Sequence, residues 1–196
     1  MENVSEDKRR HRSGARTTRN ARAETDQLPA RESFAVSIGE LAGQIGARRV
    51  ASFVPHGSEP DILGLPGGSI LLPRLFLSET EALPAGSWAW WDGRSPMERP
   101  VPGRPAQPPN TRPGELSQVD LVLVPALAAD LSGTRVGQGG GWYDRALQSL
   151  LPGTVLAGVM YHWEVFAAGS LPREDHDVLL DWVITDRGAK RIPQAR

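Results

Sequence analysis

The chain contains no cysteine. This absence excludes disulfide bonds, thiolate metal ligands and a thiol nucleophile, and it is compatible with the reducing cytoplasm, where we expect the protein to reside. Any metal ion must therefore be held by oxygen or imidazole ligands. The four histidines are scattered, and no two have the spacing of metal ligands, so we expect no zinc site.

Long apolar runs and an excess of charge of one sign are also missing. No stretch approaches the roughly 20 apolar residues of a membrane-spanning helix, and the N-terminus lacks the apolar core of a signal peptide. Lys and Arg number 22 against 23 Asp and Glu, which argues against a polyanion-binding surface over the whole molecule. We therefore expect a protein that binds neither membrane nor nucleic acid. We also expect a monomer.

Runs of β-forming residues, separated by helical or long connections, indicate an α/β fold. Leu121–Val124 is typical of a strand buried on both faces of a parallel sheet. Glu32–Ala47 has apolar residues at helical spacing. The pattern predicts a three-layer α/β sandwich with a mostly parallel sheet. We expect its other strands at 49–54, 70–73, 87–91, 155–161 and 181–185, and its other helices at 142–151 and 163–168.

The length of 196 residues suits one domain with a substantial core. We expect this domain to span residues 8–187, with flexible segments at 1–7 and 188–196. The connection between the strands 49–54 and 70–73 is too short for an ordinary crossover helix. Either it is irregular, or the two strands are not parallel neighbours. Residues 92–117, rich in Pro, Arg and Gly, predict a long surface loop that is a candidate to cover the site.

The strongest chemical signal is Gly137–Asp144, which reads GQGGGWYD. Its glycines let backbone N–H groups turn towards a ligand, and the predicted helix behind them adds partial positive charge. Phosphates bind at such places, although a tight structural turn gives the same pattern. The segment lacks the Gly-Lys-Ser/Thr ending of a P-loop, and it does not fit the dinucleotide-binding fingerprint.

A carboxylate in the first turn of this helix strengthens the phosphate interpretation. Asp144 is placed to hold Mg²⁺ against phosphates on the glycines, because Mg²⁺ prefers one or two carboxylates plus phosphate oxygens. Helix capping is the alternative role for this side chain. A second carboxylate is available from a late polar loop, which offers Asp175, Asp177 and Asp181.

Residues 8–22 form a basic segment without an acidic side chain. Lys8, Arg12, Arg16 and Arg19 would share one face of a helix. A glycine and two threonines weaken that helix, so a solvated or disordered basic arm is the alternative. Nucleic-acid binding is a further reading of the charge, but no aromatic residues are interleaved to support it.

These features together resemble the 5-formyltetrahydrofolate cyclo-ligase family, also called 5,10-methenyltetrahydrofolate synthetase. Asp120–Leu147 is similar to the family's strand followed by its Arg-Leu-Gly-x-Gly-x-Gly-Tyr-Tyr-Asp-Arg signature. Weaker matches follow the family's order: the basic Lys-x-x-x-Arg segment, a Phe-Val-Pro…Glu-x-Asp strand and loop, and a late His-Asp-x-x-x-Asp segment. The resemblance implies a Rossmann-like sandwich of the NagB/RpiA/CoA-transferase-like kind.

The resemblance also implies a reaction. Family members use ATP and Mg²⁺ to close 5-formyltetrahydrofolate, with or without a polyglutamate tail, to 5,10-methenyltetrahydrofolate, and they release ADP and phosphate. The formyl oxygen is activated by phosphoryl transfer, and such catalysis consists mainly of positioning and charge neutralisation. The alternative is a catalytically impaired relative that binds only nucleotide and folate, because the shortened first crossover could leave its pocket incomplete.

The match carries roles to individual residues. Asp144 and Asp177 would hold Mg²⁺, and Glu59 would accept hydrogen bonds from the pterin ring. The folate pocket would be lined by Val54, Glu59 and Trp142. Catalytic roles would fall to Arg135, Tyr143 and Arg145. The nucleotide would be bound by Lys8, Arg12, Arg135, Gly137, Gln138, Gly139, Gly140, Gly141, Trp142 and Tyr143.

Some positions depart from the family pattern or leave the assignment open. Arg9, Arg10 and Arg16 are alternatives to Lys8 and Arg12 as phosphate contacts. Gln138 stands where Tyr or Arg is common, Val136 replaces Leu, Trp142 replaces the first Tyr of the signature, and Gln107-Pro108 replaces the usual Glu-Pro. These departures leave the folate side less defined than the nucleotide side.

Overall fold

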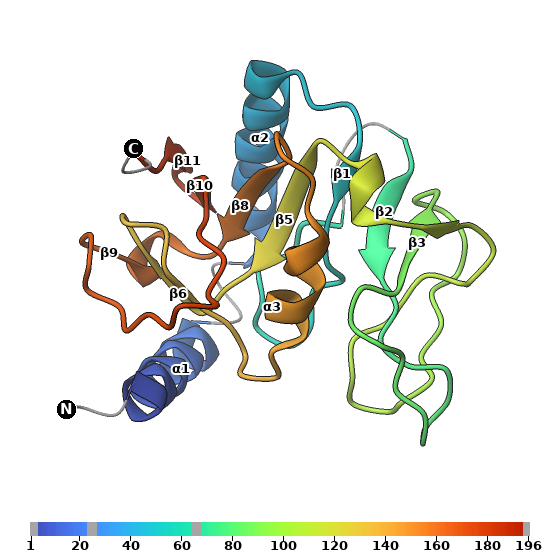
Figure 1. Ribbon diagram of the computed structural model, residues 1–196, viewed down its shortest axis with the longest axis horizontal. Coiled ribbons are helices and arrows are strands. Elements are labelled where there is room, and N and C mark those ends of the chain that lie inside the picture. The colour runs from blue at the N-terminus through green and yellow to red at the C-terminus, as the bar shows by residue number, and fades with distance from the viewer. Residues whose placement is uncertain (1–3, 23–26, 64–67, 194–196) are drawn as a thin grey trace.

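An eight-stranded sheet forms the centre of the protein in the computed structural model, which describes residues 4–22, 27–63 and 68–193 (Figure 1). The strand order is β11-β10-β8-β5-β1-β2-β3-β4. Neighbours from β10 to β2 are parallel, and antiparallel strands flank them at both edges. The strands are β1 (Val50–Ala51), β2 (Ile70–Pro73), β3 (Trp88–Trp91), β4 (Pro113–Gly114), β5 (Leu121–Pro125), β8 (Val155–Val159), β10 (Trp182–Thr185) and β11 (Gly188–Arg191).

A smaller sheet and several helices surround the large sheet. The small sheet has the order β7-β6-β9 and consists of β6 (Ala128–Asp130), β7 (Arg135–Val136) and β9 (Val165–Phe166). The α-helices are α1 (Val4–Arg22), α2 (Gln27–Ile45) and α3 (Trp142–Ala146), and the 3₁₀ turns are η1 (Leu116–Gln118), η2 (Leu147–Ser149) and η3 (His162–Glu164). None of the helices in the described ranges combines the length and the apolar character that crossing a membrane requires.

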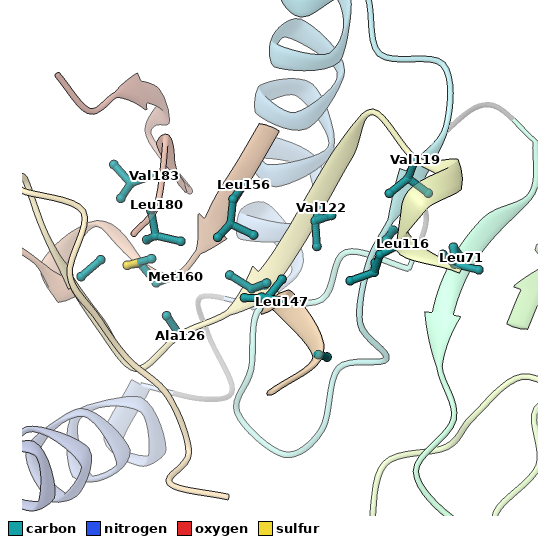
Figure 2. Close-up of a cluster of buried hydrophobic side chains, with 14 of the residues drawn as sticks. Leu71, Leu116, Val119, Val122, Ala126, Leu147, Leu156, Met160, Leu180 and Val183 are labelled. Atoms are coloured by element: carbon teal, nitrogen blue, oxygen red, sulfur yellow. The ribbon is translucent and has the colours of Figure 1, made fainter. Parts of the chain in front are cut away.

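Alternating side chains of β5 produce a core on each face of the large sheet. Leu121 and Leu123 pack on one face with the apolar stripe of α2. Val122 and Val124 pack on the other face, where Figure 2 shows Leu147 of η2 beside the sheet. Because α2 and α3 cover opposite faces (Figure 1), the predicted three-layer α/β domain with a mostly parallel sheet is confirmed. Its Rossmann-like classification stays a prediction.

The first crossover is irregular, as one of the two sequence alternatives expects. β1 and β2 are parallel neighbours, with Ala51 paired to Leu71, and the described residues between them contain no helix. β1 is much shorter than the strand expected at 49–54. After the bond from Ser52 N to the carbonyl oxygen of Leu71, the chain leaves the sheet, so Phe53 and Val54 lie beyond its edge.

Three predictions about other segments are wrong. α1 begins at Val4, so residues 4–7 are helical and do not form a flexible extension. Residues 188–191 form β11, which returns antiparallel along β10 after a tight turn and leads to the buried Ile192. The helix expected at 163–168 is the turn η3 followed by β9, because Val165 and Phe166 pair with the small sheet. Residues 1–3 and 194–196 lie outside the described ranges.

The interpretation of residues 8–22 as a solvated or disordered arm is also wrong. Arg19 of α1 is buried and donates from Nε and Nη2 to the carboxylate of Glu164, at 2.6 and 2.7 Å. Its Nη2 also donates to the carbonyl oxygen of Ala126 at 2.6 Å. The helix is therefore held against the body of the protein by a partner that lies 145 residues further along the chain.

Within the long segment 92–117, which joins the large sheet through β4, one fully buried amide also holds the chain to the residues that follow β2. Gln107 Oε1 accepts hydrogen bonds from the backbone N–H groups of Leu75 and Phe76, at 3.0 and 3.1 Å. Its Nε2 donates to the carbonyl oxygen of Phe76 at 2.8 Å. This pattern uses both the acceptor and the donor of the amide, which is a physical reason for Gln where the family commonly has Glu.

We therefore expect Gln107→Glu to destabilise the protein. A buried carboxylate would still accept from the two N–H groups, but it would face the carbonyl oxygen of Phe76 without a proton to donate. The free energy of unfolding at neutral pH should fall by about 2 kcal/mol. Urea denaturation followed by circular dichroism measures this change.

Gln148→Glu is the matched control, because Gln148 is exposed in η2 and the same change there should leave the free energy of unfolding within about 0.5 kcal/mol of the wild type. Equal stability of the two variants would contradict the structural role of the Gln107 amide.

Candidate active site

A pocket of about 620 Å³ lies at the C-terminal ends of β1, β2 and β5. This is the edge at which α/β sheets bind ligands. Its walls come from the segments after these strands, from α1, from residues 135–144 and from the late loop at 174–177. Segment 104–106 of the long loop closes one side together with Leu75 and Phe76.

The glycine loop, residues 137–141, forms one wall of the pocket. Gly139 has a φ of 99° and Gly141 a φ of 63°, a region that side chains with a Cβ rarely adopt. A Cβ on Gly139 would also lie 3.3 Å from the guanidinium carbon of Arg12, and one on Gly141 would lie 2.9 Å from Arg145 Nη1. The positive φ values therefore require glycine at both positions, whereas the two arginine side chains are flexible enough to move away from a Cβ.

The basic residues of α1 that are candidate phosphate contacts lie on different sides of the helix. Lys8, Arg12 and Arg16 line the pocket. Arg12 Nε donates to the carbonyl oxygen of Gly137 at 2.9 Å, which fastens the helix to the glycine loop. Arg9 and Arg10 instead pair with acidic residues of their own helix on its exposed side. The geometry favours Lys8 and Arg12, with Arg16 beside them.

Lys8 lies between two carboxylates of the late loop. Its Nζ is 2.7 Å from Asp177 Oδ2 and 2.8 Å from Glu174 Oε2. Burial lowers the pKa of Lys8, but the hydrogen bonds to Asp177 and Glu174 outweigh burial and leave the pKa above its usual value. Burial likewise raises the pKa of Asp177, and the Lys8 ammonium with the Glu174 N–H more than offsets it. Lys8 and Asp177 are thus both charged at neutral pH.

Arg135 makes a second internal ion pair in the pocket, with Asp144. Its Nη1 also donates to the carbonyl oxygen of Val178 at 2.5 Å, and its side chain is buried. Burial lowers the pKa of Arg135, whereas Asp144 and Asp177 oppose this shift. A guanidinium keeps its charge at neutral pH even so. Arg135 therefore lies within the field of both carboxylates that the sequence assigns to the metal.

Two aromatic residues bring unpaired polar atoms to the pocket wall. Trp142 and Tyr143 line the pocket, and their rings meet edge to face with centroids 5.0 Å apart. Trp142 Nε1 and the Tyr143 hydroxyl are buried and have no hydrogen-bond partner in the part of the chain that the structure describes. Burial raises the pKa of Tyr143, so the hydroxyl keeps its proton. A ligand with acceptor atoms would satisfy such donors.

The folate side of the predicted site is organised by Glu59. Its Oε2 accepts from the backbone N–H of His56 at 3.1 Å, and its Oε1 accepts from Gln138 Nε2 at 3.0 Å. Gln138 is held in turn by Arg16, whose Nη2 lies 2.8 Å from Gln138 Oε1. A carboxylate can accept about four hydrogen bonds, so Glu59 keeps acceptor capacity for a ligand.

Nearly all of the predicted site residues come together. Lining the pocket are Lys8, Arg12, Val54, Glu59, Arg135, Gly137, Gln138, Gly139, Gly140, Gly141, Trp142, Tyr143, Asp144 and Asp177. Arg145, predicted to be catalytic, is exposed beside the pocket wall, with Nη2 3.4 Å from the carbonyl oxygen of Gly140. Asp175 and Asp181 also lie outside the lining, and Asp181 accepts from the backbone N–H of Leu156.

Sequence reasoning missed several lining residues. Glu174 and His176 belong to the same loop as Asp177, and ligand atoms of these three side chains lie within 4.8 Å of one another. Arg104 reaches the pocket from the long loop. The polar run at residues 172–177 (PREDHD) indicates a site but does not identify which of its side chains line it. No local sequence feature distinguishes Arg104 from the other arginines of its loop.

The donor set fits a magnesium ion. Asp144 and Asp177 supply the oxygen ligands that Mg²⁺ prefers, and the neighbouring glycine loop and cations suit the phosphates that usually accompany this ion. The backbone of the loop, the Tyr143 hydroxyl and five basic side chains thus converge on one polar pocket.

Comparisons with known proteins point to one family. The model of the 5-formyltetrahydrofolate cyclo-ligase family matches residues 4–186. The chain is 31% identical over 157 residues to 5-formyltetrahydrofolate cyclo-ligase of Mycolicibacterium smegmatis. This match covers 76% of this chain and 79% of that protein. It is 33% identical over 82 residues to the mitochondrial 5-formyltetrahydrofolate cyclo-ligase of Arabidopsis thaliana, covering 38% of this chain and 30% of that protein.

Solved structures share the fold. The NMR structure of Aquifex aeolicus 5,10-methenyltetrahydrofolate synthetase superposes with a TM-score of 0.76 at 24% identity, covering 96% of this chain and 94% of that chain. The 5,10-methenyltetrahydrofolate synthetase of Mycoplasma pneumoniae gives a TM-score of 0.68 at 18% identity, covering 92% and 99%. With the family match over residues 4–186, we conclude that this chain belongs to the 5-formyltetrahydrofolate cyclo-ligase family.

Proposed function

We propose that this protein catalyses the ATP- and Mg²⁺-dependent cyclisation of 5-formyltetrahydrofolate to 5,10-methenyltetrahydrofolate. The formyl oxygen attacks the γ-phosphorus of ATP, and ADP leaves. N10 of the folate then attacks the activated formyl carbon and loses its proton, and the formyl oxygen departs with the phosphate. This chemistry needs no side-chain nucleophile, and it depends on positioning and charge neutralisation.

One observation carries the proposal: a single pocket holds cations, a glycine loop and carboxylates next to Glu59. Lys8, Arg12 and Arg135 are placed to offset the negative charge of a triphosphate. Asp144 and Asp177 are the residues that would hold Mg²⁺, which supplies further charge neutralisation when bound. The Tyr143 hydroxyl, protonated and without a partner among the described residues, is a candidate donor to a phosphate or formyl oxygen.

The folate would occupy the opposite part of the pocket. The unused lone pairs of Glu59 would accept hydrogen bonds from a ring that presents N–H donors, as pterin does. Val54 and Trp142 would offer apolar surface to the same ring. Gln138, which belongs to the loop proposed to hold the phosphates, donates to Glu59, the side chain proposed to bind the folate. The two substrates would therefore bind side by side, as direct phosphoryl transfer requires.

Further expectations stay predictions: a monomer, a substrate with or without a polyglutamate tail, and a cytoplasmic location. The alternative of a relative that binds but does not catalyse rests on the shortened first crossover, of which residues 64–67 lie outside the described ranges. Activity decides between the two.

The primary test is an absorbance assay for 5,10-methenyltetrahydrofolate formed from 5-formyltetrahydrofolate. We expect product only when ATP and Mg²⁺ are both present, and none when EDTA is added. A folded protein that binds both substrates by calorimetry without forming product would instead support the binding-only alternative.

The metal assignment predicts that Asp177→Asn lowers kcat about 100-fold, because part of the transition-state charge is no longer offset. Steady-state kinetics with saturating ATP and folate measure the loss. Asp175→Asn is the matched control: it makes the same change two residues away on an exposed side chain outside the pocket. Near-normal turnover of Asp177→Asn would refute the role of this carboxylate.

The folate assignment predicts that Glu59→Gln raises KM for 5-formyltetrahydrofolate about tenfold or more, because a charged acceptor is lost. The KM for ATP should change little. Asp61→Asn serves as control, since Asp61 pairs with Arg31 on the exposed surface nearby. If Glu59→Gln instead raised the KM for ATP alone, the folate would not bind at Glu59.

A further inference from the structure

The two carboxylates proposed to hold Mg²⁺ are already neutralised by the cations proposed to hold phosphate. Asp177 is paired with Lys8, and Asp144 is paired with Arg135. The Lys8 and Asp177 side chains are each only 7% exposed, so this contact is sheltered from water and is stronger than a surface pair. Within these two pairs the charges thus neutralise one another in this structure.

We propose that Lys8 is the resident counter-ion of Asp177 and Glu174, and that metal and triphosphate bind by exchanging partners with this ion pair. Asp177 and its neighbour Glu174 would turn from Lys8 to hold the metal, and the released ammonium of Lys8 would hold the phosphate. This inference rests on the proposed function, because it concerns the same metal and nucleotide. It adds that a metal ion or a triphosphate that binds alone finds its partner already engaged in this ion pair. When both bind, each charge of the ion pair has a new partner.

Electrostatics explains why separate binding is unfavourable. A metal ion that approached Asp177 alone would have to displace the ammonium of Lys8 or remain close to it, and like charges repel. A triphosphate alone would have to draw Lys8 from two carboxylates and leave a buried Asp177 uncompensated, which is costly. Arrival of both ligands removes both penalties, so metal and nucleotide bind with positive coupling.

Lys8 is better suited to this exchange than Arg135. Arg135 is also fixed by the carbonyl oxygen of Val178. Lys8 carries its charge on a flexible four-carbon stem with three rotatable donors. The helix that carries Lys8 is anchored elsewhere by Arg19, so the ammonium can change partners while α1 keeps its place.

The test measures Mn²⁺ binding to the full chain without nucleotide, by electron paramagnetic resonance. Lys8→Met keeps the length of the side chain and removes its charge, so Asp177 and Glu174 lose their counter-ion. We expect Mn²⁺ to bind about tenfold more tightly than in the wild type. Arg9→Met is the matched control on the exposed side of α1 and should change the affinity less than twofold. Unchanged or weaker Mn²⁺ binding to Lys8→Met would overturn the exchange.

A second variant tests the other ligand and does not alter Lys8. Glu174→Gln removes one of the two partners of Lys8 at a half-exposed position. Calorimetry with ATP and EDTA should then show binding about threefold to tenfold tighter than in the wild type. Asp175→Asn removes a charge next to it and should have a smaller effect. An equal gain from both variants would indicate general charge repulsion and contradict the exchange.

Combining Lys8→Met with Glu174→Gln tests the contact between Lys8 and Glu174 itself. If Glu174 acts on ATP through Lys8, Glu174→Gln should no longer tighten metal-free ATP binding in the Lys8→Met background. Persistence of the full gain would overturn the proposal. These outcomes are separate from the folate assay. Tighter Mn²⁺ binding by Lys8→Met, with no cyclisation by the wild type, would support the exchange and refute the reaction. Cyclisation by the wild type, with Mn²⁺ binding unchanged in Lys8→Met, would support the reaction and refute the exchange.

Discussion

The buried ion pair between Arg19 and Glu164 is the contact on which the candidate site depends. Burying two charges is costly unless each is fully hydrogen-bonded. Arg19 meets this condition with the Glu164 carboxylate and the Ala126 carbonyl, and its guanidinium also lies 5.6 Å from the ring centre of Tyr161. Because α1 has few apolar residues, this pair supplies the fixed point from which Lys8 and Arg12 reach the pocket.

The layers of the fold could be predicted because their signals are local. Buried strands such as Leu121–Pro125 are runs of β-formers, and the apolar stripe of α2 repeats at helical spacing. Short strands such as β9 and β11 could not be predicted, because their two to four residues take their conformation from a neighbouring strand. The helix expected at 163–168 was wrong for the same reason: pairing with β6 outweighs a weak local preference.

The site was predictable where its residues are contiguous or match a long motif. The glycine loop and Asp144 lie together in the chain, and the family resemblance added Lys8, Glu59 and Asp177. What the sequence could not supply is which charges meet, since the partners of Lys8 lie 166 and 169 residues away. Arg104 and Glu174 were missed because only the folded chain brings them to the pocket.

The distance between these partners along the chain also bears on how the protein is made. α1 precedes its partners by a long stretch of chain: Glu164 lies 145 residues after Arg19, and the carboxylates that receive Lys8 lie 166 and 169 residues after it. A growing chain on the ribosome therefore carries a basic helix without these acidic partners until residues 164–177 have been made. Strands β1 and β5 can pair before then, whereas the pocket wall at 174–177 is added only afterwards.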